Sequence, residues 1–208
     1  MAAQDPAASQ GRVPAAPGEP VLVVGLGNPG PEYAETRHNL GFRVVDLLAG
    51  RMGARFSAHK TGAEIAEGRR SGRRVILAKP RSYVNLSGAA VAGVLRYFSL
   101  PVDSLVVVHD ELDLPFGVVR LKRGGGEGGH NGLRSVSASL GTKDYFRTRF
   151  GIGRPPGRMD PADYVLRRFS AAERRELDVG VELSADAVEI LLDEGLEQAQ
   201  NRFHPING

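Results

Sequence analysis

The chain has 208 residues, of which 41% are hydrophobic and 25% charged, and its formal net charge at pH 7 is +3. These values are typical of a soluble globular protein with a full core, and they exclude a disordered or membrane protein. The chain has no cysteine, which excludes disulfides, zinc–thiolate and iron–sulfur sites, and a cysteine nucleophile. No apolar run approaches the roughly 20 residues that a membrane-spanning helix needs.

Residues 1–19 are rich in Ala, Pro, Gly and Gln. They have neither the positively charged start nor the apolar centre of a secretory signal. We therefore expect a disordered leader at 1–19, a single domain over 20–204 and a short tail at 205–208. A cytoplasmic location is the default expectation.

The predicted elements alternate between strands and helices. An unbroken apolar run at 21–26 predicts a buried strand, and apolar positions at helical spacing from Leu40 predict a helix. The remaining expected elements are strands at 62–67 and 74–78 joined by a Gly68-to-Gly72 hairpin, a helix capped by Asn85 or Ser87, strands at 105–108 and 118–122, a glycine-rich loop at 124–129, a helix at 131–140, a strand at 146–152, a loop at 154–161 and one long helix at 171–198. This order favours an α/β fold, in which one twisted mixed β-sheet lies between helical layers.

Charge is unevenly distributed along the chain. Residues 120–158 hold nine Arg or Lys against two acids, whereas residues 171–197 hold nine acids against two Arg. A concentration of positive charge favours a polyanionic partner such as nucleic acid. Basic patches also serve solubility, so this observation alone leaves both interpretations open.

The segment Gly-Leu-Gly-Asn-Pro-Gly at 25–30 matches the dinucleotide-binding pattern G-x-G-x-x-G, and Asp46 lies about where a ribose-binding acid is expected. Two features argue against that function. Asp46 falls within a helical pattern on its solvent side, whereas the ribose-binding acid ends a second strand. In addition, Pro29 and Pro31 remove two N–H donors from the turn that should hold the pyrophosphate.

The residues that remain for catalysis are a histidine and a carboxylate. There is no G-x-S-x-G nucleophile motif and no H-E-x-x-H metal motif. His38 follows the first strand and Asp110 the strand at 105–108. If those strands are neighbours, Asp110 can orient one imidazole nitrogen while the other takes a proton from water. The alternative is structural: His38 caps a turn, and Asp110 pairs with an arginine.

Three asparagines lie in glycine-flanked segments, namely Asn28, Asn85 and Asn131. A neutral amide both donates and accepts hydrogen bonds, so it can hold a peptide backbone or a developing oxyanion. Each alone is also a common turn or cap residue. Together with the His–Asp pair they favour a peptide-like substrate. Glu111 and Asp113 form a possible carboxylate pair, but their spacing on an irregular segment favours a structural role.

Five motifs resemble those of the bacterial-type peptidyl-tRNA hydrolases, in the right order from about residue 20 to residue 204. They are Gly-Leu-Gly-Asn-Pro-Gly-x-x-Tyr-x-x-Thr-Arg-His-Asn (25–39), Asn-Leu-Ser-Gly (85–88), His-Asp-Glu-Leu-Asp-Leu (109–114), Gly-Gly-Gly-x-Gly-Gly-His-Asn-Gly-Leu (124–133) and Gly-Ile-Gly-Arg-Pro (151–155). The resemblance implies a monomeric esterase, free of metal and cofactor, that cleaves the bond between a peptide and the 3′ ribose of tRNA. Residues 20–204 would then be its catalytic domain.

The same resemblance implies a role for each matching residue. His38 would be the general base on water, Asp110 its orienting partner, and Asn28 the group that holds the scissile carbonyl or its oxyanion. Asn85 and Asn131 would bind the peptide backbone and the attacking water, and Tyr33 and Tyr83 would join them in binding substrate. Lys122 and Arg149 would clamp a tRNA phosphate with help from Arg134, a contact that positions the substrate without reading its sequence.

Two residues depart from the family pattern. Val84 stands where many relatives carry Met, which would reshape the peptide groove. Glu127 occupies the variable position of the glycine loop, where a carboxylate facing tRNA phosphates would weaken binding. Two other functions compete with hydrolysis: a non-catalytic RNA-binding module that uses the same basic face, and a nucleotide-dependent oxidoreductase. Pure RNA binding would not need a water-activating pair together with three asparagines.

Overall fold

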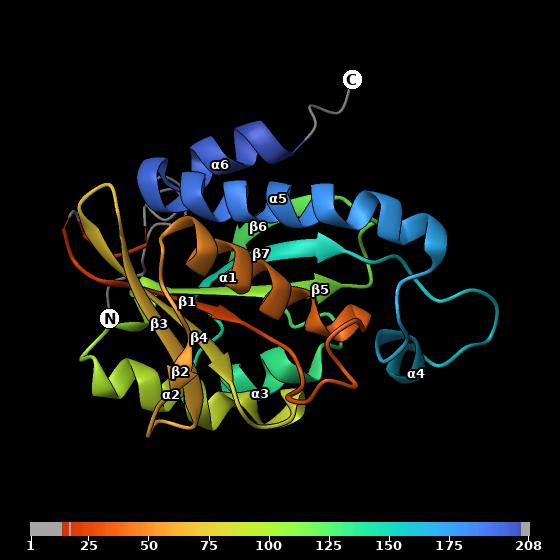
Figure 1. Ribbon diagram of the computed structural model, residues 1–208, viewed down its shortest axis with the longest axis horizontal. Helices are drawn as coiled ribbons and strands as arrows, with labels where there is room; N and C mark the ends of the chain where they lie inside the picture. The colour runs from red at the N-terminus through yellow and green to blue at the C-terminus, as the bar shows by residue number, and fades with distance from the viewer. Residues whose placement is uncertain (1–13, 17, 205–208) are drawn as a thin grey trace, which may run out of the picture.

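The computed structural model describes residues 14–16 and 18–204. A seven-stranded mixed sheet lies between two helical layers, and the strand order is β2-β3-β4-β1-β5-β7-β6. Figure 1 shows α1, α5 and α6 on one face of the sheet and α2 and α3 on the other. The predicted α/β fold with one mixed sheet between helices is confirmed.

The strands and helices have the following bounds. The strands are β1 Val21–Gly25, β2 Ser57–Ala58, β3 Ala63–Arg70, β4 Arg73–Pro80, β5 Leu105–Glu111, β6 Val119–Arg123 and β7 Phe146–Gly151. The α-helices are α1 Leu40–Arg51, α2 Ser87–Tyr97, α3 Asn131–Leu140, α4 Pro161–Val165, α5 Ala171–Glu194 and α6 Leu196–Phe203. Short 3₁₀ helices are η2 Arg37–Asn39, η3 Val84–Leu86 and η4 Val102–Ser104. None of the described helices is long and apolar enough to cross a membrane.

The sheet divides the apolar interior into two cores. Residues of β1 alternate between them: Val21 and Val23 pack toward α1 and α5, and Leu22 and Val24 pack toward α2 and α3. All four side chains are fully buried. The unbroken apolar run in the sequence therefore reflects a strand that is covered on both faces.

Strand β1 is the topological switch point of the sheet: β2, β3 and β4 lie on one side of it, and β5, β7 and β6 lie on the other. It pairs in parallel with β4 on one side and with β5 on the other. In open α/β sheets, a ligand crevice forms beyond the carboxyl ends of strands at such a point. The segment that follows β1 therefore begins at the expected edge for a site.

The predicted hairpin is confirmed, but its turn was placed too broadly. Strands β3 and β4 pair as far as Arg70 and Arg73, which leaves a two-residue turn at Ser71 and Gly72 with φ of 49° and 79°. Gly68 belongs to β3, where it pairs with Val75 of β4. It also packs closely on Met52, because an added Cβ would lie 2.9 Å from the Cβ of Met52. Glycine there reflects close packing in the strand, and the turn lies beyond it.

Three other boundaries differ from the prediction. The long helix predicted over 171–198 breaks at Gly195, whose φ of 91° ends α5 and begins α6. Strand β5 continues beyond Val108 to Glu111, because its pairing with β7 extends that far. Neither Asn85 nor Ser87 caps α2: its N-cap is Leu86, with no side-chain cap hydrogen bond. The structure also contains β2 and α4, which the sequence did not predict.

The structure describes only part of the two predicted terminal segments. The guanidinium of Arg73 donates hydrogen bonds to the carbonyls of Pro14 and Ala16, at 2.9 and 3.4 Å. Residues 1–13 and 17 of the predicted leader and the predicted tail at 205–208 lie outside the described residues.

Candidate active site

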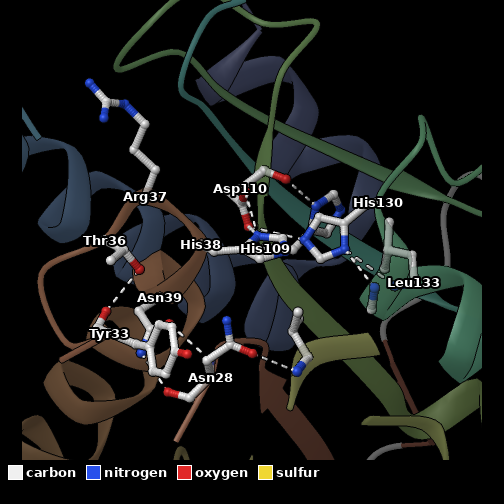
Figure 2. A network of polar contacts seen from close by, with 12 residues as sticks. Asn28, Tyr33, Thr36, Arg37, His38, Asn39, His109, Asp110, His130 and Leu133 are labelled. Atoms are coloured by element: carbon white, nitrogen blue, oxygen red, sulfur yellow. Dashed lines mark hydrogen bonds and ion pairs between the residues drawn. The ribbon is translucent and has the colours of Figure 1, made fainter. Parts of the chain in front are cut away.

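The parallel pairing of β1 with β5 joins the two candidate catalytic segments. Gly25 is in register with Val108, so the residues beyond these positions share one edge of the sheet. His38 Nδ1 lies 2.9 and 3.1 Å from the two carboxylate oxygens of Asp110, and both side chains are buried. The structure thus meets the condition on which the predicted pair depended, and Figure 2 shows the contact.

This contact determines the tautomer of His38. A carboxylate can only accept, so Nδ1 carries the proton that it donates to Asp110, and Nε2 keeps a lone pair. Burial lowers the pKa of His38, but the charge of Asp110 and the hydrogen bond to it raise that pKa by more, so the net shift is upward. Burial raises the pKa of Asp110, but the neighbouring imidazoles more than offset this and hold it well below its usual range. Asp110 is therefore anionic when His38 is a base.

A second histidine, His130, completes the cluster, and the sequence analysis did not assign it a role. Its Nδ1 accepts from the backbone N–H groups of Gly132 and Leu133 at the start of α3, at 3.1 and 3.3 Å. Its Nε2 must then carry a proton, which it donates to Asp110 Oδ1 over 3.0 Å. The available signal was its place between a glycine loop and a predicted helix, beside Asn131. The ring centroids of His38 and His130 are 4.8 Å apart.

The cluster has a third histidine behind it. His109 is buried and donates from Nδ1 to the backbone carbonyl of Asp110 over 2.7 Å. Burial and the neighbouring His130 hold the pKa of His109 well below its usual range. His109 is therefore neutral and contributes no positive charge that would compete with His38 for Asp110.

The cluster also has the spacing of a metal site. Ligand atoms of His38, Asp110 and His130 lie within 4.8 Å of one another. In the structure these facing atoms are joined by N–H···O hydrogen bonds. Each imidazole orientation is thus explained by proton donation to Asp110.

Asn28 is fixed so that its amide nitrogen is available to a ligand. Its Oδ1 accepts from the backbone N–H of Val84 over 2.7 Å, so Nδ2 is the free end. Its backbone is clamped by Asn39, whose amide accepts from the Asn28 N–H at 2.9 Å and donates to the Asn28 carbonyl at 2.8 Å. In Figure 2 the amide nitrogen of Asn28 points toward the imidazole cluster. Such a preset donor suits an oxyanion.

Other predicted residues surround this centre. A cleft of about 270 Å³ is lined by His38, Asp110, His130, Asn131 and Arg134, among others. Arg134 donates to the side-chain oxygen of Asn131 over 3.4 Å. The cleft therefore joins the His–Asp pair to one predicted peptide-binding residue and one predicted phosphate-binding residue.

The remaining predicted peptide-binding residues do not line that cleft. Asn85 is exposed on η3, next to Val84, which holds Asn28. The rings of Tyr33 and Tyr83 meet edge to face at 6.2 Å, and Tyr83 is 55% exposed. Tyr83 directly precedes Val84, whose backbone N–H holds Asn28.

The predicted phosphate-binding residues Lys122 and Arg149 lie on the adjacent strands β6 and β7. Burial lowers the pKa of Lys122, and the nearby charges of Arg149 and Arg147 lower it further. Arg147 is fully buried and donates to the carbonyls of Gly125 and Gly126, which holds the glycine loop in place. Closely spaced cations of this kind favour an anionic ligand.

The two departures from the family pattern have defined environments. The carboxylate of Glu127 accepts from Lys143 Nζ over 3.1 Å, and this hydrogen bond is the main cause of its lowered pKa. Its negative charge therefore has a cation beside it. Val84 is buried, and its backbone N–H holds Asn28.

Asp46, the residue of the dinucleotide pattern, is exposed on α1 and pairs with Lys79 at 2.7 Å.

Arg37 connects the catalytic segment to the C-terminal helices, a role that the sequence analysis also missed. Its guanidinium donates to Glu173 at 2.6 Å and to the carbonyl of Arg168 at 2.7 Å. Its backbone N–H donates to the carbonyl of Arg167 at 3.1 Å. Because Arg37 precedes His38, these contacts restrict the position of the imidazole.

Comparison with known proteins places this chain in a family. Residues 22–207 match the family model described as peptidyl-tRNA hydrolase. The peptidyl-tRNA hydrolase of Rhodococcus erythropolis is 70% identical over 184 residues, which cover 88% of this chain and 97% of that protein. The protein of the same name from Nocardia farcinica is 67% identical over 186 residues, covering 89% and 96%.

A solved structure agrees with these sequence relatives. The crystal structure of a mutant peptidyl-tRNA hydrolase from Acinetobacter baumannii superposes with a TM-score of 0.85 at 35% identity, covering 91% of this chain and 96% of that one. The fold, nearly the whole length of the chain and the five motifs lead to the same conclusion. The chain belongs to the peptidyl-tRNA hydrolase family.

Proposed function

We propose that this chain hydrolyses the ester between a peptide and the 3′ ribose of tRNA by means of a water molecule activated by His38. The observation that carries this proposal is the buried His38–Asp110 contact in a member of this family. Nε2 of His38 takes a proton from water as the oxygen attacks the ester carbonyl. Asp110 stabilises the imidazolium that forms, and the Nδ2 of Asn28 donates to the carbonyl oxygen as it becomes negative. The imidazolium then returns the proton to the ribose oxygen that leaves.

The direct test is release of the acyl group from diacetyl-lysyl-tRNA, measured with and without a chelator. We expect turnover in both conditions, because this chemistry uses only side chains of the protein. Absence of turnover would contradict the hydrolase assignment. Binding of the RNA without turnover would instead support an RNA-binding module.

A second test replaces the proposed oxyanion donor. Asn28→Asp keeps an oxygen to accept from Val84 but replaces the Nδ2 donor with an acceptor. We expect kcat to fall by about 10²- to 10³-fold, the usual effect of losing one oxyanion donor. An unchanged kcat in the folded variant would show that Asn28 is not the oxyanion donor.

The pH profile should show an acid limb that reports His38. The base form of His38 is needed, and its pKa lies above the ordinary value of 6.5. Activity should therefore rise with pH through a pKa above 6.5 and level off once the imidazole is neutral. Asp110, whose pKa is held low, stays anionic throughout. We would measure kcat/KM on one substrate across pH 5–9, and an acid limb centred well below 6.5 would contradict the proposal.

We propose that Lys122 and Arg149 bind a phosphate of the tRNA, with Arg134 at the mouth of the cleft. Lys122→Ala should raise KM and should reduce the slope of log KM against log salt concentration by about one unit, because one phosphate contact is lost. Lys60→Ala removes an exposed lysine near Tyr97 and is the matched control. If the slope of log KM against log salt concentration were equal in the two variants, Lys122 would make no contact with a tRNA phosphate.

The proposed site requires one protomer. His38, Asp110 and His130 of one chain are joined by hydrogen bonds to Asp110, and Val84 of the same chain holds Asn28. We propose that the protein acts as a monomer in the cytoplasm, where translation produces its substrate. Tyr33, Tyr83, Asn85 and Asn131 would hold the peptide and the attacking water around this centre.

A further inference from the structure

A second hollow, of about 390 Å³, is lined by Asn28 together with residues of α1 and the end of β4. His38 and Asp110 do not line it. Its walls combine apolar and charged groups. The residues that matter below are Asn28, Phe42, Arg43, Lys79, Pro80 and Arg81.

The hollow has unbalanced positive charge. Its two acids both contact the same lysine: Asp46 lies 2.7 Å and Glu64 3.4 Å from Lys79 Nζ. Arg43 and Arg81 have no carboxylate partner among the described residues. The Nε of Arg43 is also buried without a hydrogen-bond partner. Two guanidinium groups are thus available to an anion in a wall that also offers Phe42 and Pro80.

The order of strands at the edge of the sheet indicates which part of the substrate lies here. Along that edge β4 leads into Arg81, β1 into Asn28, β5 carries Asp110 and β7 carries Arg149. The reacting ester lies between Asn28 and Asp110. The proposed phosphate-binding residues are on the β7 side, so the tRNA leaves the ester in that direction. The peptide must leave on the β4 side, where the hollow lies.

We propose that this hollow is a subsite for an acidic side chain of the peptide, close to the ester, and that Arg43 and Arg81 bind its carboxylate. This inference rests on the proposed function and adds a substrate preference to it. The planar guanidinium groups suit a carboxylate. The apolar wall accommodates the methylene groups of the same side chain. A lysine in the peptide would meet like charge.

The test compares three substrates on the same tRNA, with glycine as the esterified residue. The preceding residue is N-acetylated Glu, Gln or Lys. For the unaltered protein we expect kcat/KM to be about fivefold higher with Glu than with Gln, as for a partly exposed ion pair, and lowest with Lys. In the double variant Arg43→Gln/Arg81→Gln the Glu-to-Gln ratio should fall to near one. Arg96→Gln, an exposed arginine on α2, should keep the full ratio.

Each outcome bears on a separate claim. Hydrolysis of the Gln substrate by the unaltered protein reports the proposed function, whereas the Glu-to-Gln ratio reports the subsite. A ratio of one in the unaltered protein, or a ratio that survives in the double variant, would overturn the subsite. An equal loss on all three substrates with a smaller salt slope would assign the two arginines to the tRNA, and would overturn it as well.

Discussion

Replacing His38 by alanine should reduce kcat/KM for peptidyl-tRNA by about 10³-fold or more, because the general base on water is lost. His38 Nδ1 is held by Asp110 at 2.9 Å, so in this site Nε2 is the nitrogen with a free lone pair. The effect should fall on kcat, because the imidazole acts on the reacting water. KM should change little, since the proposed tRNA and peptide contacts lie elsewhere.

The matched control is His59→Ala. His59 lies outside both hollows, bonds to Thr61 and packs on Tyr97, so its loss should leave turnover unchanged. Circular dichroism and thermal unfolding of both variants would establish that each is folded. A folded His38→Ala protein with normal turnover would eliminate His38 as the base.

Asp110→Asn should cost about 10³- to 10⁴-fold in kcat, the size of effect seen when an orienting carboxylate in a hydrolase becomes an amide. The carboxylate of Asp110 accepts from both His38 and His130. An amide offers one oxygen and one NH₂ group. If its oxygen stays at the Oδ1 position to accept from His130, the NH₂ group takes the Oδ2 position, which lies 2.9 Å from His38 Nδ1. If NH₂ faces His38, the imidazole must accept at Nδ1 and carry its proton on Nε2, which is then no longer a base.

The pH profile distinguishes this cause from a general loss of structure. The charge of Asp110 and the hydrogen bond to it raise the pKa of His38 against the effect of burial. Without them burial dominates, so the acid limb of the residual activity should move to lower pH than in the unaltered protein. Asp178→Asn changes an exposed aspartate on α5 and should shift neither the rate nor the limb. An unshifted limb in Asp110→Asn would mean that Asp110 does not set the protonation of His38.

The elements that followed directly from the sequence are those with local causes. The buried strand at 21–26 was visible because both faces of β1 are apolar. The helix at 131–140 was visible because its apolar positions recur at helical spacing. The break at Gly195 was missed because the amphipathic pattern continues into α6, whereas the φ of 91° that ends α5 leaves no trace in hydrophobic spacing. The cap of α2 was misplaced because Asn85 lies on a preceding 3₁₀ turn.

For the site, the sequence identified candidate residues, and the tertiary structure showed which of them are in contact. The residue types and motif order, by resemblance to a known family, gave His38, Asp110 and the three asparagines as candidates. Only the tertiary structure joined His38 to Asp110, because their contact depends on the parallel pairing of β1 with β5. The paired residues Val23 and Val106 lie 83 residues apart in the sequence, so the pairing is a long-range contact that no local pattern specifies. It also showed that His130 donates to Asp110 and that Val84 orients Asn28. Such hydrogen bonds depend on where distant backbones meet, and no local pattern in the chain encodes that position.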